Sequence, residues 1–472
     1  MNTPIKAVLM GAGNRGMTYG GYALKYPDKL NFVAVAEPIK RRREKFAQLH
    51  HISEDNIFND WVELLTQNKL ADVAVICTQD QMHTNPTITA LEKGYDILLE
   101  KPMAHTLEDC LTIVQKAEET GRILGVCHVL RYTDFFNTIK KTIESGRLGK
   151  IINITHRENV AWYHYSHSYV RGEWANREIS SPMILAKCCH DLDLLYWFVN
   201  DIPTKISSTG GLLHFIRQNA PEGAPEYCVE GCPIEDSCLY YAPRIYIDIE
   251  PIIQIVQKSN KRFYKFLMKL RKDHVKFLNF LAKIIPPLKR LRYWRDWPVN
   301  YLYEEEEEDY SDETKRSILK RSPYGKCVYQ SDNNVVDHQL VQINFSNGVT
   351  ANLTMHGFSE SEGRTLRIDG TKGTLRGQFM SFGETITFYD HFTGEKEKIF
   401  QKELDVSGAQ HGGGDYKLLD AFIETLTTKE TTSLTNAREA IESHMMAFAA
   451  DEARLHERMV NMDMYHKKLK DT

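Results

Sequence analysis

A glycine-rich hexapeptide near the start of the chain places the strongest constraint on its fold. Its six residues are Gly11, Ala12, Gly13, Asn14, Arg15 and Gly16. They have the spacing G-x-G-x-x-G, follow a β-rich run at Ile5–Met10 and precede a helical pattern. Glycines at this spacing permit a tight turn, close approach of the backbone to a pyrophosphate, and phosphate binding at a helix N-terminus. The hexapeptide predicts a dinucleotide-binding unit, with a glycine turn that binds no ligand as the alternative.

An acidic residue after the next expected strand bears on which dinucleotide is bound. Glu37 follows the β-rich run Asn31–Ala36, where a carboxylate accepts hydrogen bonds from a ribose 2′-hydroxyl. The basic stretch Lys40–Arg43 comes next and could receive a 2′-phosphate, although a solvated helix start is the simpler interpretation. A carboxylate at this place repels a phosphate. We therefore predict NAD in preference to NADP.

The order of the expected elements divides the chain into two domains. Up to residue 128, short β-rich runs alternate with helical patterns, which indicates a parallel sheet covered by helices. From 129 to 472, longer strand patterns joined by hairpins indicate an open, mainly antiparallel sheet. We predict an α/β fold: a Rossmann dinucleotide-binding domain at 1–128, then an α+β domain for substrate binding and oligomerisation. A Cys-rich and helical insertion at about 216–335 interrupts the second domain.

Composition argues against several other classes of protein. Hydrophobic residues make up 42% of the chain and charged residues 26%, as in ordinary globular proteins. A net charge of -4 argues against nucleic-acid binding as the main role. No apolar run reaches the length of a membrane span, and the N-terminus lacks a signal-peptide pattern. The nine cysteines, an odd number, do not suggest a secreted disulfide framework, so we expect a cytoplasmic protein.

Four short motifs occur in order along the chain. They are the glycine-rich hexapeptide, Thr78–His83, Glu100–Pro102 and His190–Asp193. Taken singly, Lys101 would be interpreted as a surface lysine and His190 as a packed histidine on an apolar helix. Together the motifs resemble the Gfo/Idh/MocA family, named after glucose–fructose oxidoreductase and inositol dehydrogenase. The resemblance covers residues 1 to about 215 and about 335 to 450.

The resemblance implies both the cofactor contacts and the chemistry. Beyond the hexapeptide and Glu37, the implied contacts of NAD(P) come from Thr78, Gln79, His83, Glu100 and Lys101. Lys101 and His190 are implied to serve the hydroxyl that is oxidised. An imidazole, with an unperturbed pKa of ~6.5, suits a general base. Open sheets of this family pair between subunits, so a homo-oligomer is implied as well.

One position departs from the family pattern D-x-x-x-H-x-x-D. The first aspartate of that pattern falls on Ala186, and Lys187 stands beside it. We therefore assign no aspartate role here. Lys187 is either a residue that binds an anionic or hydroxyl-rich substrate or a structural lysine. Asp193 is interpreted as an orienting residue.

Hydrogen-bond donors and an aromatic platform before His190 suit a sugar or polyol. Together with Lys187 and two residues at the domain crossover, the expected substrate-binding residues are Arg131, Tyr132, His164, His167, Arg171, Trp174 and Lys187. The segment resembles a family subgroup with H-x-x-H-S-x-V-R-G-x-W at this place. A metal bound by the histidines is the weaker alternative, because no carboxylate completes the spacing.

Four cysteines of the insertion form a candidate metal site. Cys228, Cys232 and Cys238 are closely spaced, and Cys327 follows further along the chain. Four thiolates suit a structural tetrahedral zinc ion, although the spacing is wider than the usual C-x-x-C pair. Free buried thiols or a redox pair are the alternatives. None of these interpretations gives the cysteines a part in hydride transfer.

The insertion also carries a basic amphipathic helical pattern. Its apolar stripe consists of Phe263, Phe266, Leu270, Phe277, Leu281 and Ile284, with lysines and arginines on the other face. Such a helix can lie on a membrane or dock a partner. We favour packing on its own fold or against another subunit, with the acidic run Glu304–Glu308 available to neutralise it.

We therefore predict an NAD-dependent oxidoreductase that transfers a hydride between the nicotinamide and a hydroxyl-bearing carbon of a sugar, glycoside or polyol. The expected partner is this small-molecule carbohydrate. Two alternatives stay open. One is an NAD-dependent redox glycosidase, in which transient oxidation is followed by elimination. The other is a dinucleotide-binding protein without catalysis, which Ala186 keeps open.

Overall fold

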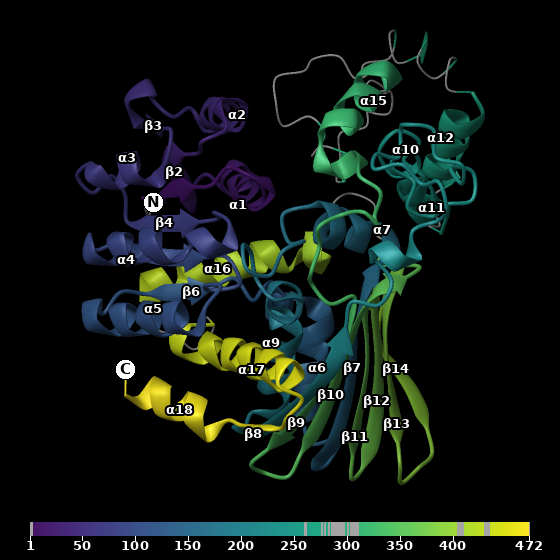
Figure 1. The fold of residues 1–472 in the computed structure, drawn as a ribbon. Coiled ribbons are helices and arrows are strands. Elements are labelled where there is room, and N and C mark those ends of the chain that lie inside the picture. Colours follow the sequence, from purple (N-terminus) through teal and green to yellow (C-terminus); the bar gives the residue numbers. More distant parts are fainter. Residues whose placement is uncertain are drawn as a thin grey trace.

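The computed structural model describes residues 3–258, 262–274, 311–403, 410–428 and 435–471, with isolated positions between 277 and 302. These residues build two sheets that stand side by side (Figure 1). The acidic run at 304–308 and much of the basic helical pattern beyond residue 274 lie outside the described residues. Within the described part of the chain, no helix is both long and apolar enough to cross a membrane.

The first sheet is parallel and has the strand order β3-β2-β1-β4-β5-β6. Its strands are β1 (Ile5–Met10), β2 (Leu30–Ala36), β3 (Ile57–Phe58), β4 (Val73–Ile76), β5 (Asp96–Leu99) and β6 (Leu124–Val126). The helices are α1 (Asn14–Lys25), α2 (Lys40–His50), α3 (Trp61–Thr66), α4 (Thr84–Glu92) and α5 (Leu107–Thr120). The strand order reverses between β1 and β4, and ligands of such sheets bind at the carboxyl ends of the strands there. The predicted Rossmann domain is confirmed.

The second sheet has nine strands in the order β14-β13-β12-β11-β7-β10-β9-β8-β15. Their bounds are β7 (Ile151–Ala161), β8 (Pro203–Gly211), β9 (His338–Phe345), β10 (Thr350–Ser359), β11 (Gly363–Gly370), β12 (Gly373–Met380), β13 (Gly383–Asp390), β14 (Lys396–Glu403) and β15 (Val460–Asn461). Among the described strands, β7 and β10 pair in parallel and the other neighbours are antiparallel. Buried and exposed residues alternate along β9, as expected for a sheet with one covered face. The predicted open, mainly antiparallel sheet is confirmed.

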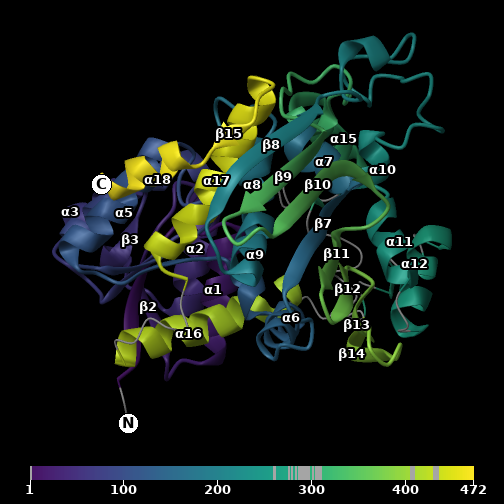
Figure 2. The ribbon, with the colours of Figure 1, turned by 90° about the horizontal axis from the view of Figure 1, so that it is seen from below.

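Helices that follow the Rossmann sheet in the sequence connect the two sheets. They are α6 (Asp134–Glu144), α7 (Trp162–Tyr165), α8 (Met183–Ala186), α9 (Cys189–Val199), α16 (Gly414–Thr428), α17 (Ala437–Leu455) and α18 (Asp463–Lys470). The long helix α17 packs against β8 and α9 of the second domain and against α5 of the first (Figure 2). Its small and apolar residues, among them Ala440, Met445 and Ala449, are buried at this junction.

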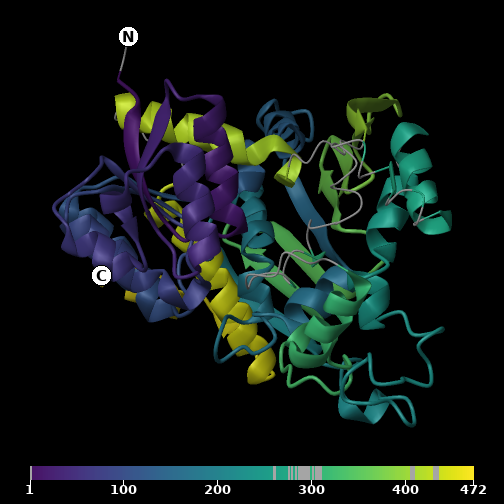
Figure 3. The same cartoon turned by 90° about the horizontal axis from the view of Figure 1, so that it is seen from above.

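The helix α16 comes late in the sequence but covers the Rossmann domain. It lies beside α1 (Figure 3). Leu418 and Phe422 are buried in the same hydrophobic cluster as Phe32 of β2. The Tyr22 hydroxyl donates a hydrogen bond of 2.6 Å to Oδ1 of Asp420. Residues from both ends of the chain therefore complete this face of the domain.

The insertion contributes a separate group of helices. Those described are α10 (Ala242–Tyr246), α11 (Glu250–Lys258), α12 (Arg262–Asp273) and α15 (Asp312–Arg321), which lie near α7 (Figure 1). Met268 of α12 is buried, whereas Phe266 is 59% exposed. Met268 is not part of the predicted apolar stripe, whose described members are exposed (Phe266, Phe277 and Ile284) or half-buried (Leu270 and Leu281).

Candidate active site

The glycine loop between β1 and α1 has no room for side chains at two positions. Gly11 has a φ of +94°, and a Cβ atom there would lie 2.5 Å from the carbonyl oxygen of Cys77. A Cβ atom at Gly16 would lie 2.1 Å from the carbonyl oxygen of Gly11. The sequence thus folds into a bare backbone cradle in front of helix α1, which fits a dinucleotide pyrophosphate.

Glu37 is buried at the end of β2 and faces this loop. Its Oε2 accepts a hydrogen bond of 2.7 Å from the backbone N–H of Ala12, and its Oε1 accepts one of 3.0 Å from that of Ile39. The Arg43 guanidinium donates to the backbone carbonyl of Glu37. The Glu37 carboxylate is therefore fixed beside the cradle. Arg43 is one of the four basic residues considered for a 2′-phosphate, and the backbone of Glu37 holds its guanidinium.

Arg15 and Glu100 meet in a buried polar network. Arg15 Nε donates to Glu100 Oε1 at 2.6 Å, and its Nη2 donates to Asp415 Oδ1 at 2.5 Å. The Tyr19 hydroxyl donates to the same Glu100 oxygen at 2.5 Å. Although burial alone would raise it, the Arg15 guanidinium and the Tyr19 hydroxyl hold the pKa of Glu100 below its ordinary value. This network ties the loop that precedes Lys101 to the glycine loop and to α16.

His83 joins the two loops that follow β4 and β5. Its Nδ1 lies 2.7 Å from the carbonyl oxygen of Pro102 and its Nε2 lies 3.0 Å from that of Thr78. The ring is buried. Gln79, in the same loop, accepts a hydrogen bond of 3.0 Å from the Gln81 amide. His83 therefore sets the position of the loop that carries Lys101.

Lys101 reaches from the Rossmann domain to the second domain. Its Nζ donates a hydrogen bond of 2.9 Å to the backbone carbonyl of Ala186, at the end of α8. His190 lies in the first turn of α9, four residues after Ala186, and is buried. Its ring packs edge-on against His128, with 5.8 Å between the ring centroids. Lys101 thus contacts the end of α8, and His190 lies in the first turn of the next helix, α9.

Each of the two aspartates of α9 forms a buried ion pair with an arginine: Asp193 with Arg131, and Asp191 with Arg364. The Arg131 guanidinium makes two hydrogen bonds of 2.7 Å to Asp193 and a further contact to Glu439. Asp191 accepts a hydrogen bond of 2.8 Å from Arg364, and His156 Nε2 lies 2.7 Å from its Oδ1. These pairs fix α9, and with it His190, in orientation.

A second charged cluster surrounds Lys187. Its Nζ lies 2.5 Å from Glu362 Oε1 and 3.4 Å from Glu158 Oε1. His164 Nδ1 lies 3.0 Å from Glu362 Oε2, and Arg364 pairs with Glu158 at 2.8 Å. Although burial alone would lower it, the two glutamates hold the pKa of Lys187 above its ordinary value. Burial raises the pKa of Glu158 to about 8, and the neighbouring Asp191 adds to this.

The other expected substrate-binding residues contact other parts of the fold. His167 Nδ1 lies 2.8 Å from the Tyr246 hydroxyl, and Arg171 donates to the backbone carbonyls of Lys326 and Tyr240, all in the insertion. Trp174 Nε1 donates to Asp80 of the cofactor domain at 3.2 Å. The Tyr132 hydroxyl accepts a hydrogen bond of 3.1 Å from the backbone N–H of Thr435. Of the two expected histidines before α8, His164 is the one that the structure brings into the cluster of Lys187.

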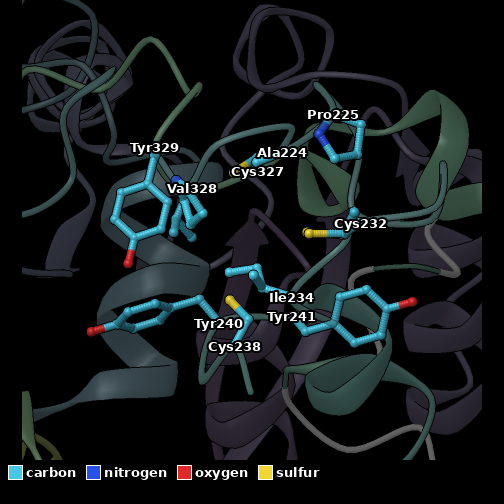
Figure 4. Close-up of a pocket in the computed structure, with 12 residues that line it drawn as sticks. Ala224, Pro225, Cys232, Ile234, Cys238, Tyr240, Tyr241, Cys327, Val328 and Tyr329 are labelled. Atoms are coloured by element: carbon cyan, nitrogen blue, oxygen red, sulfur yellow. The ribbon is translucent and has the colours of Figure 1, made fainter. Parts of the chain in front are cut away.

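The expected structural zinc site is not supported. Cys228, Cys232, Cys238 and Cys327 line one pocket, shown in Figure 4, and all are free thiols. Within the described residues, which include all four, no three histidine, cysteine or acidic side chains are arranged to hold a metal. Apolar and aromatic side chains share the lining with the sulfur atoms, among them Ile234 and Val328. The Cys228 thiol instead contacts the Arg171 guanidinium at 3.6 Å.

Sequence patterns missed the carboxylates around Lys187. Glu362 stands just before β11 in the turn Glu360-Ser361-Glu362-Gly363, and Glu158 lies inside β7. Nothing in these short stretches marks a site, since both act through contacts with residues distant in sequence. One signal was available: a glutamate at a strand position that is otherwise apolar, as at Glu158, predicts a buried charge that needs a partner.

A glycine cradle on a Rossmann sheet, and a lysine that reaches from it to an open-sheet domain, are features of a two-domain oxidoreductase with a dinucleotide-binding fold. The chain belongs to the Gfo/Idh/MocA oxidoreductase family. The model of the family's NAD-binding Rossmann fold matches residues 5–128. The model of its C-terminal alpha/beta domain matches residues 140–242 and 299–462. The resemblance drawn from the four motifs is thereby confirmed.

Three similar proteins illustrate this membership. YteT of Bacillus subtilis, an oxidoreductase by name, is 21% identical over 80% of this chain and 77% of its own length. Inositol 2-dehydrogenase of Salmonella typhimurium is 24% identical over 42% of this chain, which spans about half (55%) of that enzyme. An oxidoreductase from Agrobacterium radiobacter, solved with NAD+, L-tartaric acid and magnesium, has a TM-score of 0.64 at 14% identity. That likeness covers 98% of this chain and 100% of the other, and it shows the fold.

Proposed function

We propose that this chain is an NAD-dependent dehydrogenase that oxidises a hydroxyl-bearing carbon of a neutral sugar or polyol. The observation that carries the proposal is the hydrogen bond of 2.9 Å between Lys101 Nζ and the Ala186 carbonyl. It brings an ammonium group from the cofactor domain to the helix pair that bears His190. A hydroxyl between these groups would lie near the carboxyl ends of β4 and β5, where open α/β sheets bind their ligands.

The residues present fit a dinucleotide with a free 2′-hydroxyl. The bare backbone at Gly11 and Gly16 fits the pyrophosphate, and the fixed carboxylate of Glu37 fits the ribose. A 2′-phosphate at the same place would meet this negative charge. When bound, the nicotinamide supplies an acceptor for the hydride, which is the hydrogen that leaves the carbon with both electrons of the C–H bond.

Lys101 and His190 contact the reacting hydroxyl in this proposal. A protonated lysine has three hydrogen-bond donors and no acceptor, so Lys101 stabilises the negative charge that develops on oxygen. The O–H proton must then pass to a neutral base, and a histidine meets this need near neutral pH. Loss of the proton and of the hydride converts the alcohol to a ketone.

The charges around Lys187 favour a neutral substrate. Glu158 keeps its proton below about pH 8, so Lys187 and Arg364 face two ionised carboxylates, those of Glu362 and Asp191. Their positive charges are thus matched within the protein, which disfavours the anionic substrates that Lys187 alone would attract. The inositol 2-dehydrogenase that this chain resembles is named for a neutral polyol.

Self-association through the open sheet belongs to the same proposal. Alternate residues of β9 are exposed on the outer face: His338, Leu340, Gln342 and Asn344. A second copy that packs here would cover Leu340. Light scattering after size-exclusion chromatography tests this, and a monomer at micromolar concentration would contradict it.

The activity is tested with a panel of neutral polyols, aldoses and aryl glycosides in the presence of NAD. NADH that accumulates in step with ketone, with the glycosidic bond intact, supports the dehydrogenase. Release of the aglycone without net NADH would overturn it in favour of the redox glycosidase. A parallel titration of NAD and NADP by calorimetry tests the choice of cofactor.

A further inference from the structure

The aspartate that the family pattern places four residues before the histidine is replaced by Ala186. The structure supplies a carboxylate to the same region from another element. Glu362, just before β11, reaches Lys187 at 2.5 Å, and Lys187 directly follows Ala186. A carboxylate from the residue before β11 thus lies beside the helix position that lacks one.

Glu362 is held in place by several groups. Its Oε2 accepts a hydrogen bond of 2.9 Å from the backbone N–H of Ala161, at the end of β7. Lys187 binds the other oxygen. Although burial alone would raise it, His164 and Lys187 hold the pKa of Glu362 below its ordinary value. The carboxylate is therefore ionised and fixed in orientation.

The carboxylate determines which nitrogen of His164 carries the proton. Nδ1 lies 3.0 Å from Glu362 Oε2, and an ionised carboxylate can only accept hydrogen bonds. Nδ1 must then be the N–H donor. In the neutral ring, Nε2 bears the lone pair that can take a proton.

The surroundings of His164 also favour a neutral ring that can accept a proton and pass it on. Burial lowers its pKa, an effect that the Glu362 carboxylate partly offsets and that the charges of Lys187 and Lys101 increase. Lys101 Nζ binds the carbonyl of Ala186, and the next residue, Lys187, shares the Glu362 carboxylate with His164. The His164 side chain is 21% exposed, whereas His190 is buried. A proton taken up by His164 can therefore pass on to water.

We propose that His164 accepts the proton of the substrate hydroxyl at Nε2, and that Glu362 is the positioning residue that sets this tautomer. This rests on the proposed function. The O–H bond breaks and its proton moves to Nε2, while the hydrogen on carbon leaves with both electrons of the C–H bond as hydride, for which a bound dinucleotide would be the acceptor. The imidazolium that forms is stabilised by Glu362 and returns to neutral by losing its proton to water. Lys101 stabilises the oxygen, and His190 hydrogen-bonds to it.

The first test compares pH profiles of kcat/KM for polyol oxidation. The wild type should lose activity as the pH falls below the pKa of His164, because the imidazolium cannot accept a proton. His164→Asn should lower the plateau roughly 10²- to 10⁴-fold and remove this acidic limb. Glu362→Gln should lower the plateau roughly 10- to 100-fold and move the limb to lower pH, since the carboxylate no longer supports the imidazolium. Glu360 is an exposed glutamate two residues away, so Glu360→Gln is the matched control. It should change neither the plateau of kcat/KM nor the position of the acidic limb.

The second test does not depend on activity. The pKa of the His164 ring is followed by NMR in the wild type and in Glu362→Gln, and it should fall in the variant. An unchanged pKa would overturn the role of Glu362. Retention of the acidic limb and of full activity in His164→Asn, while Lys101→Ala is inactive, would overturn the role of His164 alone. Full activity in Lys101→Ala would overturn the proposed function itself.

Discussion

The ammonium group of Lys101 donates to a backbone carbonyl, that of Ala186, at 2.9 Å. A backbone acceptor survives any change of side chain at position 186. The alanine therefore removes a carboxylate from the helix without removing an anchor for the lysine. This explains how a chain that departs from the family pattern can still hold its lysine against the second domain.

Lys101→Ala should abolish polyol oxidation and leave cofactor binding largely intact. We expect NADH formation to fall roughly 10²- to 10⁴-fold, the usual loss when a group that handles the reacting proton or charge is removed. The Kd for NAD, measured by calorimetry, should change little, because the glycine loop and Glu37 are untouched. Lys205→Ala, which removes an exposed lysine, is the control and should retain activity. Oxidation at the wild-type rate in Lys101→Ala would contradict the site.

Glu37→Ala should narrow the preference for NAD over NADP. In the proposed complex the carboxylate would accept a charged hydrogen bond from the ribose, of a kind worth about 1.5–3 kcal/mol, and its loss corresponds to roughly 10- to 100-fold in NAD affinity. NADP should lose less or gain, because the repulsion is removed as well. Calorimetric titration of both dinucleotides measures the ratio. Glu44→Ala on the exposed face of α2 is the matched control, and an equal change in that variant would argue against a specific role of Glu37.

More of the fold than of the site could be predicted from the sequence, because the fold is encoded in local patterns and the site in contacts between distant residues. Hydrophobic periodicity and the glycine spacing are local, so the strands near Gly11 and the whole helix Leu107–Thr120 were predictable from the sequence. The contacts of Lys187 were not, because Glu362 is 175 residues away and approaches only through the pairing of β11 with β7. His164 and His167 look equivalent in the sequence. The turn of the chain after β7 sends one toward Glu362 and the other toward Tyr246.

Arg131→Ala should destabilise the protein more than it affects cofactor binding. Its side chain is 7% exposed and that of Asp193 is 2% exposed, so the variant leaves a carboxylate buried without its cation. Breaking such a pair costs roughly 3–5 kcal/mol in the free energy of unfolding. Urea denaturation measures the loss. Arg367→Ala breaks a surface pair with Asp369, 49% and 33% exposed, and should cost about 0–1 kcal/mol. Similar losses in the two variants would show that burial of the first pair is unimportant.

The stability of the folded protein should decline as the pH rises toward 8, in part because of Glu158. Its pKa is raised from the ordinary 4.5 to about 8 in the folded chain. Between these values the folded state keeps a proton that the unfolded state has released. The free energy of unfolding therefore falls with increasing pH.

Glu158→Gln should flatten this slope and should be more stable than the wild type above the pKa of the glutamate. Thermal unfolding at pH values from about 5 to about 9 gives the comparison. Glu395→Gln, at an exposed position, controls for the loss of one charge. A slope in Glu158→Gln as steep as in the wild type would assign the pH dependence to other groups.

The burial of α16 against α1 has a consequence for how the chain is made. Leu418 and Phe422 fill a surface of the Rossmann domain next to Phe32, almost 400 residues earlier in the sequence. As the chain leaves the ribosome, the nucleotide-binding domain emerges first but cannot cover this surface until α16, at Gly414–Thr428, has been synthesised. Its apolar side chains must wait, exposed, for their partners. Translation of α16, rather than of residues 1–128, therefore determines when the cofactor domain becomes a finished folding unit.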